Sequence, residues 1–191
     1  MDIAQSRIFM GRETYPNKYP WMAHIRYFQS DHLAVSSIIT NCFSLRFKID
    51  QFDPRYIKCG GSLIDNRHVM TAAHCIFDEY GMVRKKSLTE VYLGVHSLTD
   101  LENKYGVEKF IFDKRFSILD GKLDHDFAIL RLSENVQFNS NVYPICIPKS
   151  EFDDFDRLVV AGWGKLSAFE GAPNSLNEVE VEYIDSKCNL N

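Results

Sequence analysis

The chain has 191 residues, enough to bury one sizeable core or two small ones, and its 45% hydrophobic and 25% charged residues are ordinary for a globular protein. Its formal net charge of −4 provides no basic surface for nucleic acid or an anionic membrane, so neither is expected as a partner. The first seven residues hold no apolar stretch of signal-peptide length, and residues 33–47, the most apolar later run, are too short and polar to cross a bilayer.

Short runs with strand character alternate with turn signals along the chain. The runs are residues 21–28, 90–95, 127–132, 158–161 and 178–184. The last run alternates strictly, with Val179, Val181 and Tyr183 on one face and Glu178, Glu180 and Glu182 on the other. This period of two is typical of a half-buried antiparallel strand. With no internal repeat and no long amphipathic helix, the pattern predicts an all-β fold of barrels or a sandwich.

Residues 30–56 fit this pattern badly, because they mix apolar and polar residues without a sustained period between two well-patterned strands. A connection of that length is unusual inside a compact β-domain. It is either a long surface insertion or sequence foreign to the fold, such as translated intron.

The cysteines are five in number, namely Cys42, Cys59, Cys75, Cys146 and Cys188. An odd count means that at least one is free or pairs outside the chain. No Cys-x-x-Cys pair occurs, so a structural zinc site has little support.

The most specific segment runs from Cys59-Gly60-Gly61-Ser62-Leu63-Ile64 through His68-Val69-Met70 to Thr71-Ala72-Ala73-His74-Cys75. A lone histidine would be interpreted as structural, but the small residues before His74 let the backbone pack closely behind its imidazole. The segment resembles the histidine motif of the chymotrypsin/trypsin-like serine proteases, peptidase family S1. The resemblance implies that His74 is the general base and that a disulfide joins Cys59 to Cys75.

A second segment, Leu123-Asp124-His125-Asp126-Phe127-Ala128-Ile129-Leu130-Arg131-Leu132, is similar to the aspartate motif of the same family. The resemblance implies that the carboxylate of Asp126 accepts a hydrogen bond from His74, which holds the histidine tautomer and stabilises the imidazolium. The alternative, a solvated aspartate before a strand, is weakened by the spacing and the apolar sequel. Asp124 and His125 are expected to be exposed neighbours. The order of histidine before aspartate also differs from that of α/β-hydrolases and subtilisins.

Further matches extend the resemblance over almost the whole chain. They are Arg7-Ile8-Phe9-Met10-Gly11 as an activation junction cleaved after Arg7, Tyr19–Ala23 as the first barrel strand, Tyr143–Pro148 as the interdomain connector, and Val160–Gly164 as the opening of a second barrel. The implied fold is a trypsin-like double β-barrel, its first barrel complete with an insertion at about 30–56 and its second only partly present. Residues 1–7 would be the remnant of a pro-segment, and residues 8–191 the protease domain. Within that domain, 8–140 are mainly the first barrel and 141–191 the connector and start of the second.

One motif of the family, Gly-Asp-Ser-Gly-Gly, is absent. The serines after Asp126 are Ser133, Ser140, Ser150, Ser167, Ser175 and Ser186, and none has those neighbours. Cys188 resembles the cysteine that precedes the nucleophile segment, so we expect the sequence to stop before the serine, the oxyanion hole and the specificity pocket. Losing the serine alone costs on the order of 10⁶ in turnover in this kind of site. The partners of Cys42, Cys146 and Cys188 stay open.

No cofactor or metal is expected. Val95 and His96 follow Leu93-Gly94, where calcium-binding members of the family begin with a carboxylate, and a hard cation needs several oxygen ligands. His68, His74, Cys75 and His125 match no standard zinc spacing.

The sequence leaves two hypotheses of function. The first is a secreted, extracellular trypsin-like endopeptidase, inactive as this chain but acting on protein or peptide substrates if completed. The second is a non-catalytic homologue that works as a binding or regulatory module with protein partners. The pair His74 and Asp126 favours the first, because a binding module has no chemical need for both.

Overall fold

The computed structural model describes residues 11–28, 56–119, 124–147, 158–166 and 171–181. Their strands are β1 (Arg12–Glu13), β2 (Met22–Phe28), β3 (Tyr56–Leu63), β4 (His68–Thr71), β5 (Thr89–Leu93), β6 (Lys104–Phe112), β7 (Ala128–Leu132), β8 (Leu158–Gly162) and β9 (Asn177–Val181). Two short 3₁₀ helices, η2 (Ala73–Ile76) and η3 (Lys86–Leu88), lie between strands. Within the described ranges no helix is long and apolar enough to span a membrane.

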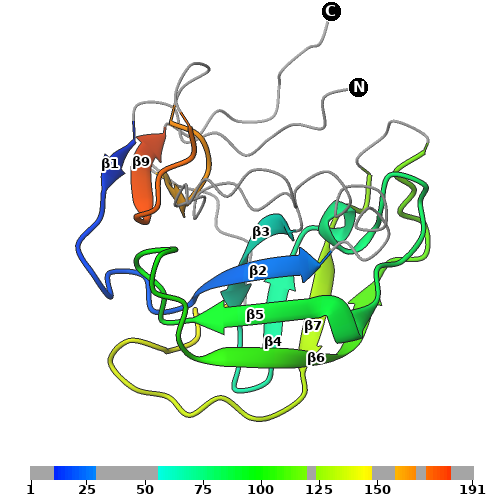
Figure 1. Ribbon diagram of the computed structural model, residues 1–191, viewed down its shortest axis with the longest axis horizontal. Helices are drawn as coiled ribbons and strands as arrows, with labels where there is room; N and C mark the ends of the chain where they lie inside the picture. The colour runs from blue at the N-terminus through cyan, green and yellow to red at the C-terminus, as the bar shows by residue number, and fades with distance from the viewer. Residues whose placement is uncertain (1–10, 29–55, 120–123, 148–157, 167–170, 182–191) are drawn as a thin grey trace, which may run out of the picture.

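Six strands close into a barrel in the order β2-β3-β4-β7-β6-β5, with every neighbouring pair antiparallel (Figure 1). The strand β2 illustrates why the barrel forms: Ala23, Ile25 and Tyr27 are buried in its core, as residues two apart on a strand share one face. Pairing of β2 with both β3 and β5 leaves neither side of this strand open.

Gly61 lies where three strands crowd together. A Cβ at this position would lie 2.8 Å from the carbonyl oxygen of Met70, 2.9 Å from Val69 Cγ1 and 3.1 Å from Ile25 Cδ1. Only glycine fits there without displacing backbone, because close-packed interiors do not absorb an added carbon. This contact gives the second glycine of the Cys59–Ile64 segment a packing role.

A separate three-stranded antiparallel sheet has the order β1-β9-β8. A small apolar cluster joins this sheet to the barrel, made of Met22, Tyr92, Val95, Trp163 and Leu176. Trp163 also donates from its Nε1 to the carbonyl oxygen of His96, at 3.1 Å. One closed barrel together with part of a second unit confirms the predicted all-β, double-barrel class.

The predicted strands agree with β2, β5, β7, β8 and β9 to within a few residues over the described ranges. One boundary differs, because Tyr56, expected in the insertion, pairs with Phe28 as the first residue of β3. The guanidinium of Arg26 lies 3.7 Å from the centre of the Tyr56 ring, which holds this residue on the barrel. The rest of the predicted insertion, residues 29–55, lies outside the described residues.

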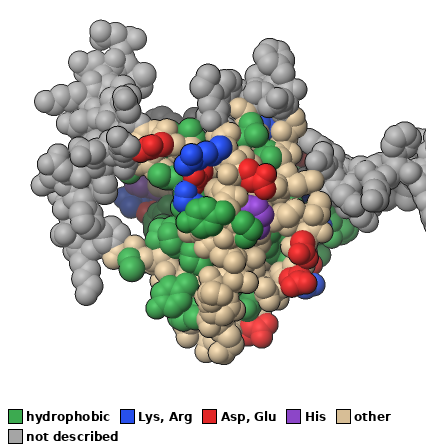
Figure 2. All heavy atoms as spheres, turned by 90° about the vertical axis from the view of Figure 1, so that its left-hand side faces the viewer, with side chains coloured by type: hydrophobic (Ala, Val, Ile, Leu, Met, Phe, Trp, Pro, Cys, Tyr) green, Lys and Arg blue, Asp and Glu red, His purple; other side chains and the backbone are tan. Residues whose placement is uncertain are grey.

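Glu178 departs from the alternation expected for its strand, because only 5% of it is exposed. Its carboxylate accepts hydrogen bonds from Arg12 Nε at 3.1 Å, from the Tyr19 hydroxyl at 2.5 Å and from Lys18 Nζ. The hydrogen bonds from Lys18, first, and from Tyr19 lower the pKa of Glu178 to about 2. Figure 2 views the side of the molecule that carries β1 and β9, where charged side chains of both signs lie among hydrophobic ones.

Candidate functional site

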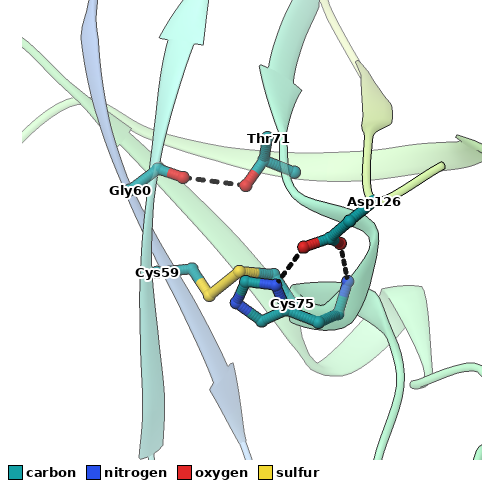
Figure 3. The surroundings of a disulfide bond; sticks show 6 residues. Cys59, Gly60, Thr71, Cys75 and Asp126 are labelled. Atoms are coloured by element: carbon teal, nitrogen blue, oxygen red, sulfur yellow. Dashed lines mark hydrogen bonds and ion pairs between the residues drawn. A yellow bond between two sulfur atoms is a disulfide. The ribbon is translucent and has the colours of Figure 1, made fainter. Parts of the chain in front are cut away.

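His74 lies on η2, directly after β4, with its backbone held close to the barrel wall. The preceding residue, Ala73, is fully buried, and Thr71 is nearly so. The hydroxyl of Thr71 donates to the carbonyl oxygen of Gly60 at 2.8 Å, which ties the end of β4 to β3 (Figure 3). The small residues that the sequence places before His74 therefore allow a tightly packed turn, as expected.

Asp126 lies two residues before β7 and reaches His74 because β4 and β7 are neighbours. Thr71 pairs with Ala128 at the end of this ladder, so the segments that leave the two strands emerge side by side. His125, with a φ of 60°, turns the chain just before Asp126. Asp124 and His125 are both exposed, as expected from the sequence.

The carboxylate of Asp126 contacts His74 at two points. Oδ1 accepts the backbone N–H of His74 at 2.8 Å, and Oδ2 lies 2.8 Å from the ring nitrogen Nδ1. Because an ionised carboxylate can only accept, the Nδ1 atom of neutral His74 carries the proton, and Nε2 keeps its lone pair. The side chains are 29% exposed for His74 and 16% for Asp126. Asp126 therefore orients the His74 ring from its Nδ1 side, and the ring is exposed enough for Nε2 to receive a proton from another group.

The predicted disulfide between Cys59 and Cys75 is confirmed, and it joins β3 to η2 across a Cα–Cα distance of 6.3 Å (Figure 3). It closes a loop between residues that are 16 apart in the sequence. A ring nitrogen of His74 and the two sulfurs lie within 4.8 Å of one another, but the disulfide bond occupies both sulfurs. In this state the group offers no thiolate to a metal ion.

Other predicted residues are placed as follows. Cys146 is a free, exposed thiol. Arg7 and Ile8 of the predicted activation junction lie outside the described residues, as do Cys42 and Cys188.

Two carboxylates make contacts that hold the segment after the predicted activation junction. Neither was predicted from the sequence. Glu178 is one, and the other is Glu13, whose Oε1 lies 3.2 Å from His96 Nε2. The hydrogen bonds from Ser175 and His96 lower the pKa of Glu13. No local signal marks these contacts, because Glu13 and His96 are 83 residues apart in the sequence.

Comparison with known proteins agrees with this geometry. The sequence model of the trypsin family matches residues 8–191. The venom serine protease Bi-VSP of Bombus ignitus is 31% identical over 97% of this chain and 47% of its own length. Phenoloxidase-activating factor 1 of Holotrichia diomphalia is 31% identical over 85% of this chain and 43% of its own length. The chain thus spans about half the length of these curated relatives.

Solved structures lead to the same family. Neuropsin, a serine protease expressed in the limbic system of mouse brain, superposes with a TM-score of 0.68 at 27% identity, covering 95% of this chain and 67% of that one. A structure titled GrC gives a TM-score of 0.67 at 25% identity, covering 91% and 64%. With the family match over residues 8–191, these similarities show that the chain belongs to the trypsin family of serine proteases.

Proposed function

We propose that this chain carries the proton-transfer half of a trypsin-like serine endopeptidase, with His74 as general base and Asp126 as the residue that orients it. The observation that carries the proposal is the two-point contact between Asp126 and His74, at 2.8 Å to the backbone nitrogen and 2.8 Å to Nδ1. The contact to Nδ1 orients the ring and sets its tautomer, and the contact to the backbone nitrogen holds the carboxylate in place beside it.

The chemistry of the pair follows from this arrangement. His74 Nε2 takes the hydroxyl proton of a serine as that oxygen attacks the peptide carbonyl, and later returns it to the leaving amine. Asp126 stays ionised and stabilises the imidazolium formed between these steps. The substrate is a protein or peptide, as befits the family.

The 191 residues contain no Gly-Asp-Ser-Gly-Gly segment, so the chain by itself has no nucleophile for His74 to activate. We therefore propose that this chain alone does not cleave peptide bonds. A serine-reactive phosphonate should leave it unlabelled under conditions that label an active trypsin-like enzyme to completion. Covalent labelling would overturn this part of the proposal.

The contact between His74 and Asp126 can be tested without measuring turnover. In proton NMR of the full chain, the Nδ1 proton of His74 should give a low-field, slowly exchanging resonance, because a hydrogen bond to a carboxylate deshields the proton and slows its exchange with water. Asp126→Ala should abolish this resonance, and the matched control Asp124→Ala should keep it. A low-field resonance that survives in Asp126→Ala would show that Asp126 does not orient His74.

A second candidate is a non-catalytic homologue that binds or regulates other proteins, and the missing serine motif favours it. The two candidates differ in what they need from His74. A purely binding module should keep its partners when His74 is replaced by Ala, whereas proteolysis by a completed enzyme should be lost.

The remaining features are proposals that follow from the family. Residues 1–7 would be a pro-segment remnant and Arg7–Ile8 the activation junction. Residues 8–140 would form mainly the first barrel and 141–191 the connector and start of the second. An extracellular location is supported by the Cys59–Cys75 disulfide, since such bonds persist in oxidising compartments.

A further inference from the structure

His74 and the two cysteines of the disulfide form a compact group of three metal-binding side chains. A ring nitrogen of His74 and the sulfurs of Cys59 and Cys75 all lie within 4.8 Å of one another. Cys59 comes from β3, while His74 and Cys75 are neighbours on η2. Their spacing in the sequence matches no standard zinc motif, so it is the fold that brings the three together.

The oxidation state of the two sulfurs decides whether this group can bind a metal ion. In the disulfide neither sulfur is a thiolate. A dithiol reductant breaks the bond by a two-electron reduction, which yields two protein thiols while the dithiol closes to its own disulfide. The sulfurs are then free to separate. Ligand atoms around a tetrahedral zinc ion lie about 3.6–3.8 Å apart, a spacing that the three atoms of this group can reach by small movements.

Other contacts hold the three side chains together besides the disulfide. Cys59 lies within the ladder between β2 and β3. The turn before η2 is tied to β3 by the hydrogen bond of 2.8 Å from the Thr71 hydroxyl to the carbonyl oxygen of Gly60. The carboxylate of Asp126 accepts the backbone N–H of His74, which holds η2 from its other side. We therefore expect the two thiols of the reduced chain to stay close to the imidazole.

Asp126 also prepares His74 as a ligand. Its Oδ2 atom lies 2.8 Å from Nδ1, so the neutral ring keeps its lone pair on Nε2. Histidines that bind metal ions in proteins almost always donate their other ring N–H to a carboxylate, a carbonyl oxygen or water, which fixes the ring and raises its basicity. The His74 side chain is 29% exposed and Cys75 is 5% exposed. An ion can thus enter beside the imidazole and reach a buried sulfur.

We propose that reduction of the bond between Cys59 and Cys75 converts this group into a zinc site, with two thiolates and the His74 imidazole as ligands and an open fourth position. Thiolates together with an imidazole favour zinc over calcium or magnesium. Each zinc ion that binds releases the two thiol protons. The bound ion occupies the lone pair with which His74 would accept a serine proton, so reduction and zinc together block the base. This last consequence rests on the proposed function, whereas the metal site does not.

The test uses the full chain with Cys42, Cys146 and Cys188 replaced by Ser, so that Cys59 and Cys75 are the remaining cysteines. The chain is reduced with a phosphine, which is removed under argon, and cobalt(II) is added as a spectroscopic substitute for zinc. One equivalent should produce a thiolate-to-cobalt charge-transfer band and the visible bands of tetrahedral cobalt. Added zinc should abolish these bands, and the oxidised chain should show neither.

Variants identify the third ligand and its support. His74→Ala should weaken zinc binding by about a hundredfold or more, because it removes one of three protein ligands. Asp126→Ala should weaken it about ten- to a hundredfold, as expected for a residue that orients a metal-bound histidine. The matched controls are His68→Ala and Asp124→Ala, which lie outside the group and should change zinc affinity little.

Several results would overturn the proposal: no tetrahedral cobalt spectrum in the reduced chain, equal binding by the oxidised chain, or unchanged affinity in His74→Ala. Near-ultraviolet circular dichroism follows the packing of every sample. A reduced chain that loses this spectrum and does not regain it with zinc would also overturn the proposal, because the barrel would not hold the thiols together. Asp126→Ala gives a separate measurement if His74→Ala loses its packing. The phosphonate and Nδ1 resonance tests use the oxidised chain, so the proposed function can fail or hold independently of this site.

Discussion

At the scale of single residues, the contacts that matter most join positions far apart in the chain. Asp126 is 52 residues from His74, and Glu178 is 160 residues from Lys18. The first pair could be predicted because each residue lies in a distinctive local motif. Glu178 could not, because a glutamate in an alternating strand is ordinarily on the solvated face. Its burial depends on Arg12, Lys18 and Tyr19, which carry no motif that points to it.

Replacing Glu178 with Gln should destabilise the chain by about 2 kcal/mol, the range for hydrogen bonds to a buried charged group. The native pKa of about 2 lies below the ordinary value of 4.5, so the stabilisation by Glu178 is complete above pH 4.5 and is lost as the pH falls toward 2. Urea unfolding at several pH values would measure both effects. Glu102→Gln, at an exposed position, is the control and should change little. Equal stability of Glu178→Gln and the parent at pH 7 would contradict the assigned role.

At the scale of elements, the strands predicted from sequence were short, strand-like runs separated by turn residues. The bounds of β3 and β6 were not predicted, and in each strand there is a physical reason why the sequence pattern is weak. In β3 the two glycines Gly60 and Gly61 replace side chains that would show a period, and Gly61 is required by close packing. In β6 the ladder shifts register between Val107 and Lys109, so a bulge breaks the alternation.

The disulfide between β3 and η2 gives a prediction at this scale. Cys59→Ala/Cys75→Ala should lower the free energy of unfolding by roughly 3 kcal/mol, as expected for opening a loop of this length. Denaturant unfolding without reductant would measure the loss. Cys146→Ala, which removes the free exposed thiol, should leave stability unchanged. An unchanged double variant would mean that the barrel alone holds the turn at His74.

At the scale of the whole molecule, the barrel and the three-stranded sheet are joined through a thin layer that includes His24. Its ring is buried between Tyr92 and Trp163, with centroid distances of 6.4 and 5.5 Å. Within the described ranges its Nε2 has no hydrogen-bond partner. Burial first, and then the charges of Lys58 and Arg26, lower the pKa of His24 from 6.5 to about 3.

The joined structure should therefore weaken in acid. Unfolded His24 takes up a proton below pH 6.5 while the folded ring does not until about pH 3, so stability is complete above 6.5 and falls as the pH drops through this window. The slope is about 1.4 kcal/mol per pH unit for one proton. His24→Leu should flatten the curve of unfolding free energy against pH by this slope between pH 6 and 5, as measured by urea titration. An identical curve for parent and variant would show that His24 does not cause the loss.

The layer between barrel and sheet has an optical consequence. The chain has two tryptophans, and both Trp21 and Trp163 belong to or pack against the cluster that joins the two units. Because Trp21 also packs against the barrel core, intrinsic tryptophan emission reports on this junction and on the adjoining part of the barrel. A red shift in emission while far-ultraviolet dichroism stays constant would mark separation of the sheet from an intact barrel. The two spectra of one sample could therefore distinguish this separation from unfolding of the barrel.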